Sequence, residues 1–212
     1  MDTNITTANN KLVEVNILKA IGNNSVANQI NDEINKTVVA ALQIGEQDAM
    51  TSKTIEESIT LFNEEYRAFN TAFPDISQPW EAQIDSEIMF QSPEVISVSV
   101  TSYVNTGGAH GNITISFLNF DASTGKRIQN SDLIKNKDAF KTIAKSYFKD
   151  AVTEDDVLFD PDNFQLPANI GFSEEGLILL YNTYEVAPYS TGIIDFTIPI
   201  EKVSDFLAFN GS

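Results

Sequence analysis

The chain has 212 residues, which is enough for one large domain or two small ones with a real hydrophobic core. Its 30 acidic and 13 basic residues give a formal net charge of −17, and such a surface repels phosphate backbones, so no nucleic acid partner is expected. There is no cysteine, which excludes disulfides and zinc–thiolate sites, and no apolar run reaches the ~20 residues that span a bilayer.

The first part of the chain predicts one strand followed by two amphipathic helices. Residues 1–10 are polar, and we expect a disordered tail. Alternating apolar residues predict a strand over 12–18. Apolar side chains four residues apart predict a helix over 25–44, and spacings of three and four predict a second helix over 55–73.

The remainder of the chain changes to a period of two. The pattern predicts three strands over 80–90, 94–104 and 112–121, separated by Ser-Pro and Gly-rich segments as in an antiparallel meander. Further on it predicts a helix over 136–152, two strands over 176–186 and 191–200, and a short helix over 201–209.

Helices first and strands later predict an α+β fold, with a mainly antiparallel sheet packed against helices. We expect two intimately packed sub-domains. The first is an N-terminal α+β sub-domain over residues 11–92, and the second is a C-terminal α+β domain over residues 93–210.

The only histidine, His110, lies in the segment Gly-Gly-Ala-His-Gly between two predicted strands. A catalytic triad needs a nucleophile, a base and an orienting group together, and no nucleophile elbow precedes this histidine. The glycines instead suit a tight turn with positive φ, in which the ring contacts backbone. We therefore interpret Gly107, Gly108, His110 and Gly111 as a structural or binding turn and expect no catalytic residue. One histidine also argues against a zinc site.

The segment 154–162 contains five carboxylates that could gather around calcium. Its spacing lacks the calcium-loop pattern, and Phe159 and Pro161 interrupt it, so we interpret it as a solvated loop. We expect no metal site and no cofactor. A carboxylate pair suited to glycoside hydrolysis stays open, because among 30 acidic residues some pair always lies close.

The segment Tyr181–Gly192 combines three tyrosines with a proline and a glycine at the end of a predicted strand. A tyrosine has a flat apolar face and a polar tip, so such a cluster can bind a sugar or a protein. It can equally form the corner of a core, and the sequence does not separate the two. The candidate binding residues here are Tyr184, Glu185, Pro188, Tyr189 and Gly192.

Three motifs, in this order, resemble a known bacterial family. They are the Gly-Gly-Ala-His-Gly turn, the turn with Phe120, Asp121, Gly125 and Lys126, and the segment Tyr-Glu-Val-Ala-Pro-Tyr-Ser-Thr-Gly. Residues 95–209 are similar to an extracytoplasmic domain of unknown function. That domain occurs in the ectodomain of the lysozyme-sensing anti-sigma-V factor (RsiV) and, as an accessory part, in PdaC-type peptidoglycan deacetylases. Residues 11–90 resemble the smaller domain that precedes it.

The resemblance implies a non-catalytic binding module of the cell envelope. It implies an extracytoplasmic location, in the periplasm or at the cell surface, where a lipid anchor on the full-length precursor would fit. The anti-sigma relative binds lysozyme, a strongly basic protein, so the expected partner is a cationic protein or a cell-wall glycan. No transmembrane segment, sigma-binding helix or deacetylase domain is expected in the chain. Signalling and deacetylation are therefore not carried over.

The leading hypothesis places the recognition face on the loops near His110 and Tyr184–Tyr189. Two alternatives stay open. The protein could be a carboxylate-based glycan hydrolase, which needs two acids about 5–10 Å apart in a cleft. It could also be an acidic inhibitor that blocks the cleft of a basic lytic enzyme.

Overall fold

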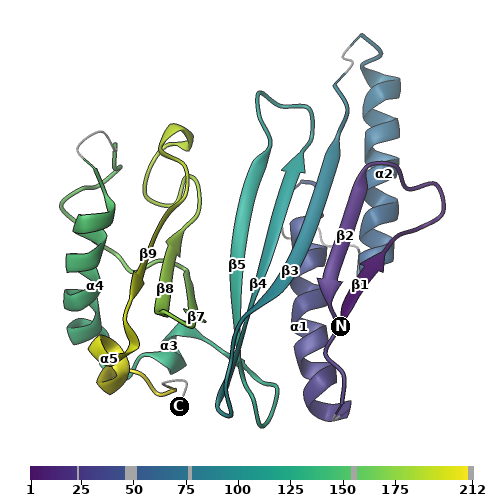
Figure 1. Ribbon diagram of the computed structural model, residues 1–212. Coiled ribbons are helices and arrows are strands. Elements are labelled where there is room, and N and C mark those ends of the chain that lie inside the picture. The colour runs from purple at the N-terminus through teal and green to yellow at the C-terminus, as the bar shows by residue number, and fades with distance from the viewer. Residues whose placement is uncertain (23, 46–51, 76–77, 154–156, 210–212) are drawn as a thin grey trace. The chain divides into compact units, whose positions relative to one another are not determined.

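The computed structural model describes residues 1–22, 24–45, 52–75, 78–153 and 157–209. Within these residues the chain forms a six-stranded mixed sheet, a three-stranded sheet and five α-helices (Figure 1). The predicted α+β fold class is therefore confirmed. In the described part of the chain, no helix combines the length and apolarity needed to cross a membrane.

The larger sheet has the strand order β1-β2-β3-β4-β5-β6. Strand β1 is antiparallel to β2, β2 is parallel to β3, and β5 is antiparallel to β6. The bounds are β1 Asp2–Ile5, β2 Val13–Leu18, β3 Glu81–Gln91, β4 Val95–Asn105, β5 Asn112–Asp121 and β6 Arg127–Ile128.

The smaller sheet is antiparallel, with the order β7-β8-β9. Its strands are β7 Asn169–Ser173, β8 Gly176–Tyr181 and β9 Ile194–Ile198. The helices are α1 Asn24–Ala41, α2 Ile55–Ala72, α3 Asn130–Leu133, α4 Lys137–Ala151 and α5 Ile200–Val203, with short 3₁₀ turns at Tyr189–Thr191 and Ser204–Phe206.

Side-chain caps explain where α2 and α4 begin. At the start of α2, Thr54 Oγ1 accepts a hydrogen bond from the backbone N–H of Glu57 at 3.1 Å, and the Glu57 carboxylate accepts one from the N–H of Lys53. At the start of α4, the Asn136 side chain accepts from the N–H of Ala139. Each cap satisfies a backbone donor that has no acceptor inside the helix.

The chain divides into two compact units. Unit 1 consists of Met1–Glu87 and Val100–Thr114, and unit 2 consists of Ile88–Ser99 and Ile115–Ser212. The long strands β3, β4 and β5 therefore contribute residues to both units. The predicted boundary between residues 92 and 93 falls in the loop that joins β3 to β4, whereas these units divide within the strands themselves.

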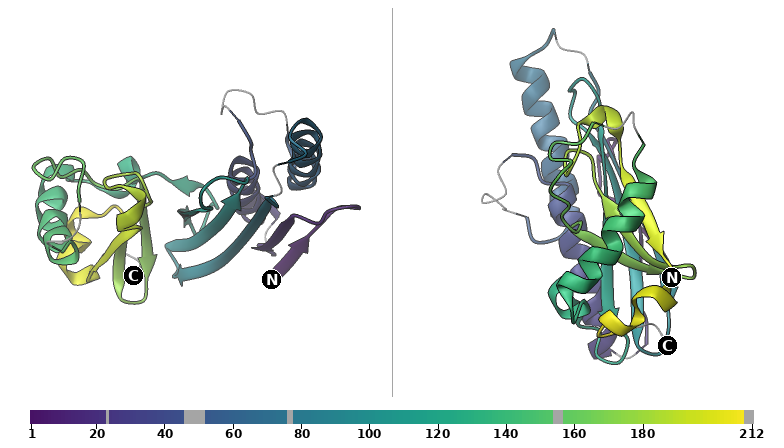
Figure 2. Two further views of the ribbon diagram at one scale, coloured as in Figure 1. Left: turned by 90° about the horizontal axis from the view of Figure 1, so that it is seen from above. Right: turned by 90° about the vertical axis from the view of Figure 1, so that its left-hand side faces the viewer.

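In unit 1, α1 and α2 lie on the same face of the strands, as the view from above shows (Figure 2). Alternate residues of β2 and of the first part of β3 are buried, because these positions point to one face of a sheet, and each helix buries one apolar stripe. The core of unit 1 includes Val13, Val15, Ile17, Ile30, Ile34, Val38, Ile59, Phe62, Trp80, Ala82 and Ile84.

In unit 2, α4 packs against the three-stranded sheet. Phe140, Ala144 and Phe148 form one buried face of the helix and belong to the same apolar cluster as the strands. The strand residues of that cluster include Ile170, Phe172, Leu177, Leu179, Tyr181, Ile194, Phe196 and Ile198.

A buried polar network joins β4, β5 and β7 inside unit 2. Ser97 Oγ donates to Asn119 Oδ1 at 2.8 Å, and Asn119 Nδ2 donates to the carbonyl oxygen of Ile170 at 2.6 Å. The backbone N–H of Phe172 completes the network by donating to Ser97 Oγ at 3.1 Å. Ser97 and Asn119 are 0% and 2% exposed, so these hydrogen bonds replace the water that both side chains lose on folding.

Several elements differ from the sequence-based predictions. Residues Asp2–Ile5, expected within a disordered tail, form β1 because β2 offers them a backbone ladder from Leu18 to Val15. The strand predicted over 176–186 ends at Tyr181, and the strand β7 was not predicted. In β3, the buried alternation is lost after Ile84, near the point where the strand passes from unit 1 to unit 2, and Ile88 is exposed.

Candidate functional site

The Gly-Gly-Ala-His-Gly segment forms the turn between β4 and β5. Gly107 has φ +82, a conformation that side chains rarely adopt, and its N–H donates to Asn105 Oδ1 at 2.9 Å. The Gln78 side chain faces the same turn. With its amide nitrogen oriented towards the turn, it donates to the carbonyl oxygens of Gly107 and Gly108 at 2.6 and 3.3 Å.

The turn lies against the aromatic cluster of unit 1. The Trp80 ring is 6% exposed and packs on Phe62, Tyr66 and Phe69 of α2, with ring centroids 5.4 to 5.8 Å apart. A Cβ on Gly107 would lie 3.3 Å from Trp80 Nε1. Glycine is therefore required at position 107 by backbone conformation and by the close approach of the indole.

The neighbouring glycines make a matched test of this explanation. We expect Gly107→Ala to lower the free energy of unfolding by about 1–2 kcal/mol, because a side chain is strained at this φ and crowds Trp80. Gly108 has an ordinary φ, and its added Cβ would meet only the carbonyl oxygen of His110 at 3.8 Å, so Gly108→Ala should change stability by less than about 0.5 kcal/mol. Urea unfolding followed by Trp80 fluorescence measures both. Equal losses in the two variants would contradict the assignment.

The imidazole of His110 is exposed, and its Nδ1 lies 3.2 Å from the carbonyl oxygen of Gly111. Gly111 in turn leaves room for the ring of Tyr103, which a Cβ at position 111 would overlap. His110 and Gly111 therefore both make contacts within the protein that account for their positions in the turn. Whether the turn also contacts a ligand stays a prediction.

The second candidate segment splits its three tyrosines between core and surface. Tyr181 is 1% exposed, its ring packs edge-to-face on Phe148 at 5.3 Å, and its hydroxyl donates to the carbonyl oxygen of Gln165 at 2.6 Å. Burial, and then the negative charge of Glu185, raise the pKa of Tyr181 above its ordinary value, so the phenol stays protonated at neutral pH. Tyr181 is the core corner that the sequence left as one possibility.

Tyr184 and Tyr189 are the surface members of the segment. Their rings lie 5.9 Å apart between centroids and are tilted by 36°, and Tyr184 is 56% exposed. Tyr184 has φ +67, an uncommon conformation for a bulky residue. The loop that follows contains the 3₁₀ turn that begins after Pro188, and Gly192, with φ +80, donates its N–H to the carbonyl oxygen of Tyr189.

Two polar side chains anchor this loop. The Glu185 carboxylate accepts hydrogen bonds from the N–H of Ala168 at 2.8 Å and from the N–H of Asn182 at 3.0 Å. The Asn182 amide bonds both the N–H and the carbonyl oxygen of Ile115 on β5, each at 2.9 Å. The unusual backbone of Tyr184 is thus held between fixed points, as strained residues in binding loops commonly are.

The structure brings together Tyr184, Glu185, Pro188, Tyr189 and Gly192 in one loop region of unit 2. It brings together Gly107, Gly108, His110 and Gly111 in one turn of unit 1. The predicted recognition face combined both sets, but they belong to different units, so we treat them as two separate surfaces.

The acidic segment 154–162 is only partly covered, because residues 154–156 lie outside the described residues. Asp160 and Asp162 are exposed, and the carbonyl oxygen of Asp160 accepts from the N–H of Asn163. Across the described parts of the chain, no three histidine, aspartate or glutamate side chains gather closely enough to hold a metal ion.

A groove in unit 1 was not predicted from the sequence. It has a volume of about 530 Å³ and is lined by β1, the end of β2, the middle of α1 and the start of α2. Lys19, Asn31, Asn35 and Lys53 contribute polar groups to its wall. These residues are far apart in the chain and form no recognisable motif, so only the folded arrangement identifies them.

Two family models match the chain. The model described as "Deacetylase PdaC" matches residues 5–113, about half of the chain. The model described as "Protein of unknown function (DUF3298)" matches residues 130–201. No match to a curated protein was found.

Two crystal structures of DUF3298 family proteins are similar over 99% of this chain. The one from Bacteroides fragilis NCTC 9343 has a TM-score of 0.69 and 18% identity, and 92% of its chain is covered. The one from Pseudomonas aeruginosa PAO1 has a TM-score of 0.64 and 17% identity, and 93% of its chain is covered. At these identities the similarity establishes the fold.

Proposed function

The chain belongs to the family whose model is described as Deacetylase PdaC, which supports an association with the cell envelope, and we propose that it acts there as a non-catalytic binding module. The second family match, to a domain of unknown function, agrees with an envelope module that has no assigned reaction. The single histidine of the chain supports a non-catalytic role, because catalytic metal sites of hydrolases commonly need several imidazole ligands.

The pair formed by the exposed Tyr184 and the half-buried Tyr189 is the observation that carries the proposal. Two tyrosine rings at the surface offer a large apolar area with polar tips, and such residues are enriched among the energetic anchors of interfaces. The hydrogen bonds of Glu185 and Asn182 restrict the loop before a partner arrives. Less conformational entropy is then lost on binding.

We propose a basic protein such as lysozyme as the partner, with a cell-wall glycan as the other candidate. Unit 2 itself contains sixteen acidic and eight basic residues, so the segment lies in an acidic unit of an acidic protein. Such a field accelerates the approach of a cationic partner and loses strength as salt is added. Family membership also supports an extracytoplasmic location, which protease accessibility in intact cells would test.

Titration of the protein with hen egg-white lysozyme, by calorimetry at low and high salt, tests the proposal. We expect saturable binding that weakens as salt increases. Tyr189→Ala and Tyr184→Ala should each weaken it about 30-fold, the effect typical of an interface anchor of about 2 kcal/mol. The control is Phe73→Ala, which truncates another exposed aromatic side chain in unit 1 and should leave binding unchanged.

Two results would contradict the proposal. One is that neither lysozyme nor purified muropeptides show saturable binding. The other is that Tyr184→Ala and Tyr189→Ala both bind lysozyme as tightly as the unchanged protein. Lytic activity of lysozyme, measured with and without the protein, then separates an inhibitor from a module that binds without blocking the enzyme. Release of reducing sugars from purified peptidoglycan by the protein alone would show catalysis and would overturn the non-catalytic assignment.

A further inference from the structure

The groove of unit 1 has the size of a small-molecule site. Its volume of about 530 Å³ falls inside the ~300–1,000 Å³ range of ligand pockets. The floor is apolar and comes from buried residues such as Ile17 and Ile55, while amides, hydroxyls and two lysines form the walls. No aromatic side chain is among the described residues that line it, so a base or a sugar face would have no ring to stack on.

The charge of the groove is opposite to that of its surroundings. Unit 1 contains fourteen acidic and five basic residues. Two of those five basic residues, Lys19 and Lys53, line the groove, and Glu56 is the one acidic residue in the described lining. Positive charge is thus concentrated at one place in an otherwise strongly negative unit.

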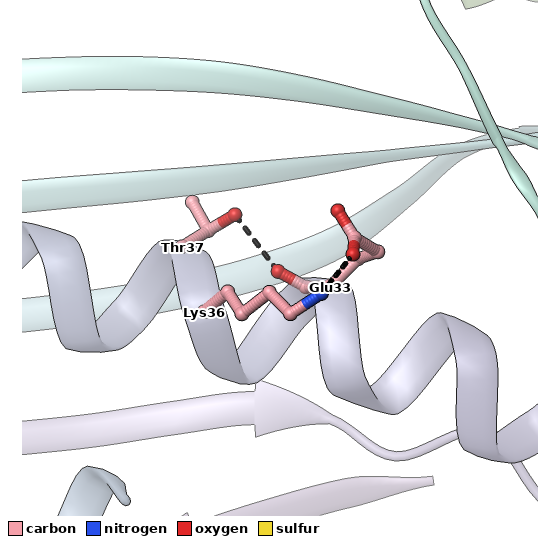
Figure 3. A network of polar contacts seen from close by, with 3 residues as sticks. All are labelled: Glu33, Lys36 and Thr37. Atoms are coloured by element: carbon pink, nitrogen blue, oxygen red, sulfur yellow. Dashed lines mark hydrogen bonds and ion pairs between the residues drawn. The ribbon is translucent and has the colours of Figure 1, made fainter. Parts of the chain in front are cut away.

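Both groove lysines are available to a ligand. Neither the Lys19 nor the Lys53 ammonium has a carboxylate partner among the described residues, and both side chains are exposed. Lys36, next to Asn35 on α1, is different: its Nζ lies 2.6 Å from Glu33 Oε1 (Figure 3). Lys36 is not part of the groove lining. Among the described residues, Lys36 therefore has a carboxylate partner, whereas Lys19 and Lys53 have none.

The two asparagine side chains of α1 that line the groove differ in their hydrogen bonds: one is bonded to the protein backbone, and the other is open to a ligand. The Asn31 side chain bonds the backbone of Ala20 in both directions, accepting at 2.8 Å and donating at 3.1 Å. These two hydrogen bonds connect α1 to the segment that follows β2 and fix one wall of the groove. The Asn35 amide, one turn further along α1, is exposed and has no hydrogen bond among the described residues, so it can donate to or accept from a ligand.

We infer that this groove binds a small ligand that carries a carboxylate flanked by amide or hydroxyl groups. The ammonium groups of Lys19 and Lys53 neutralise the carboxylate, and the Asn35 amide pairs with a neighbouring polar group. Two sources share this chemistry, an acidic sugar with an attached peptide and a free acidic peptide. The site uses residues of unit 1 alone, so it is independent of the tyrosine segment proposed above.

Calorimetric titration of the full chain with three probes tests the inference. Muramyl dipeptide carries a carboxylate, amides and a sugar; N-acetyl-Ala-Glu carries the carboxylates and amides without the sugar; N-acetylglucosamine trimer is neutral. We expect saturable binding of one or both acidic probes and at least tenfold weaker binding of the neutral trimer. Tighter binding of muramyl dipeptide than of N-acetyl-Ala-Glu would assign the sugar-linked source, and equal or weaker binding would assign the free peptide.

Three variants connect binding to the groove. Lys19→Met and Lys53→Met keep the aliphatic stem and remove the charge, and each should weaken binding of the acidic probes by at least about tenfold, the effect of losing one hydrogen bond to a charged group. Asn35→Asp should weaken binding of the acidic probes by a similar factor, because the new aspartate repels the carboxylate of the probe. Lys11→Met, an exposed lysine of unit 1 outside the lining, is the matched control and should bind normally.

The inference is overturned if neither acidic probe binds, if the neutral trimer binds equally well, or if binding is insensitive to all three groove variants. Binding that is lost in Tyr184→Ala and Tyr189→Ala, and kept in the lysine variants, would likewise overturn it. Lysozyme binding is measured in parallel, because the lysine variants should leave it unchanged. Failure of one proposal is thereby distinguishable from failure of the other.

Discussion

Replacing Gly176 with alanine should destabilise unit 2 by more than about 3 kcal/mol, the largest effect that we expect from a single methyl group in this chain. Gly176 follows the turn between β7 and β8 with φ +147, a conformation essentially restricted to glycine. An added Cβ would overlap the carbonyl oxygen of Ile198 and lie 2.9 Å from the Cα of Pro199. These are backbone atoms, so no side-chain rotation relieves the clash, and the pairing of Leu177 with Ile198 must open.

Gly192→Ala separates the two causes of that effect. Gly192 also has positive φ, +80, but nothing lies within 4 Å of its added Cβ. Gly192→Ala should therefore lower the free energy of unfolding only through the strained backbone conformation, by about 1 kcal/mol. Urea unfolding followed by circular dichroism measures both variants. If Gly176→Ala costs no more than Gly192→Ala, the close approach of β9 is not what requires glycine at position 176.

Asn119→Leu should lower the free energy of unfolding by about 3 kcal/mol, because it leaves buried polar groups without partners. Leucine has nearly the same shape as asparagine but cannot accept from Ser97 Oγ or donate to the carbonyl oxygen of Ile170. Both groups would then stay desolvated and unpaired. The network joins three strands that are distant in sequence, so the loss should appear in equilibrium unfolding of the whole of unit 2.

Asn163→Leu is the control for Asn119→Leu. Asn163 is exposed, so water replaces its partners and the change should stay below about 0.5 kcal/mol. A similar loss in the two variants would mean that leucine itself, and not the broken network, destabilises the fold. A loss below 0.5 kcal/mol in Asn119→Leu would show that the network contributes little to stability.

The candidate site was partly visible in the sequence. The segment around Tyr184 and Tyr189 stood out because its aromatic residues, proline and glycine follow a strand directly. The sequence could not separate the buried Tyr181 from the exposed Tyr184, because both follow the same apolar run. The separation depends on the end of β8 and on the turn that Glu185 and Asn182 hold.

Strand β7 was not predicted, although the sequence contains a pattern that indicates it. The segment Asn169–Tyr181 reads as two apolar runs joined by Ser-Glu-Glu-Gly, a short turn that ends in glycine. The buried Gly171 weakened the pattern of the first run. Glycine is needed at position 171 because of the tertiary structure, since a Cβ there would lie 2.6 Å from Cγ of the Phe117 ring.

Local patterns in the sequence determined the long helices, most of the strands, the Gly-rich turn and the α+β class, because each depends on periodicity or on backbone preferences within a few residues. Only the tertiary structure decided that the long strands pass from one unit to the other, that Asp2–Ile5 pair as β1, and that Lys19, Asn35 and Lys53 surround one groove. These features join residues that are ten or more positions apart in the chain. Their contact energies arise only when the chain is folded, and no local pattern encodes them.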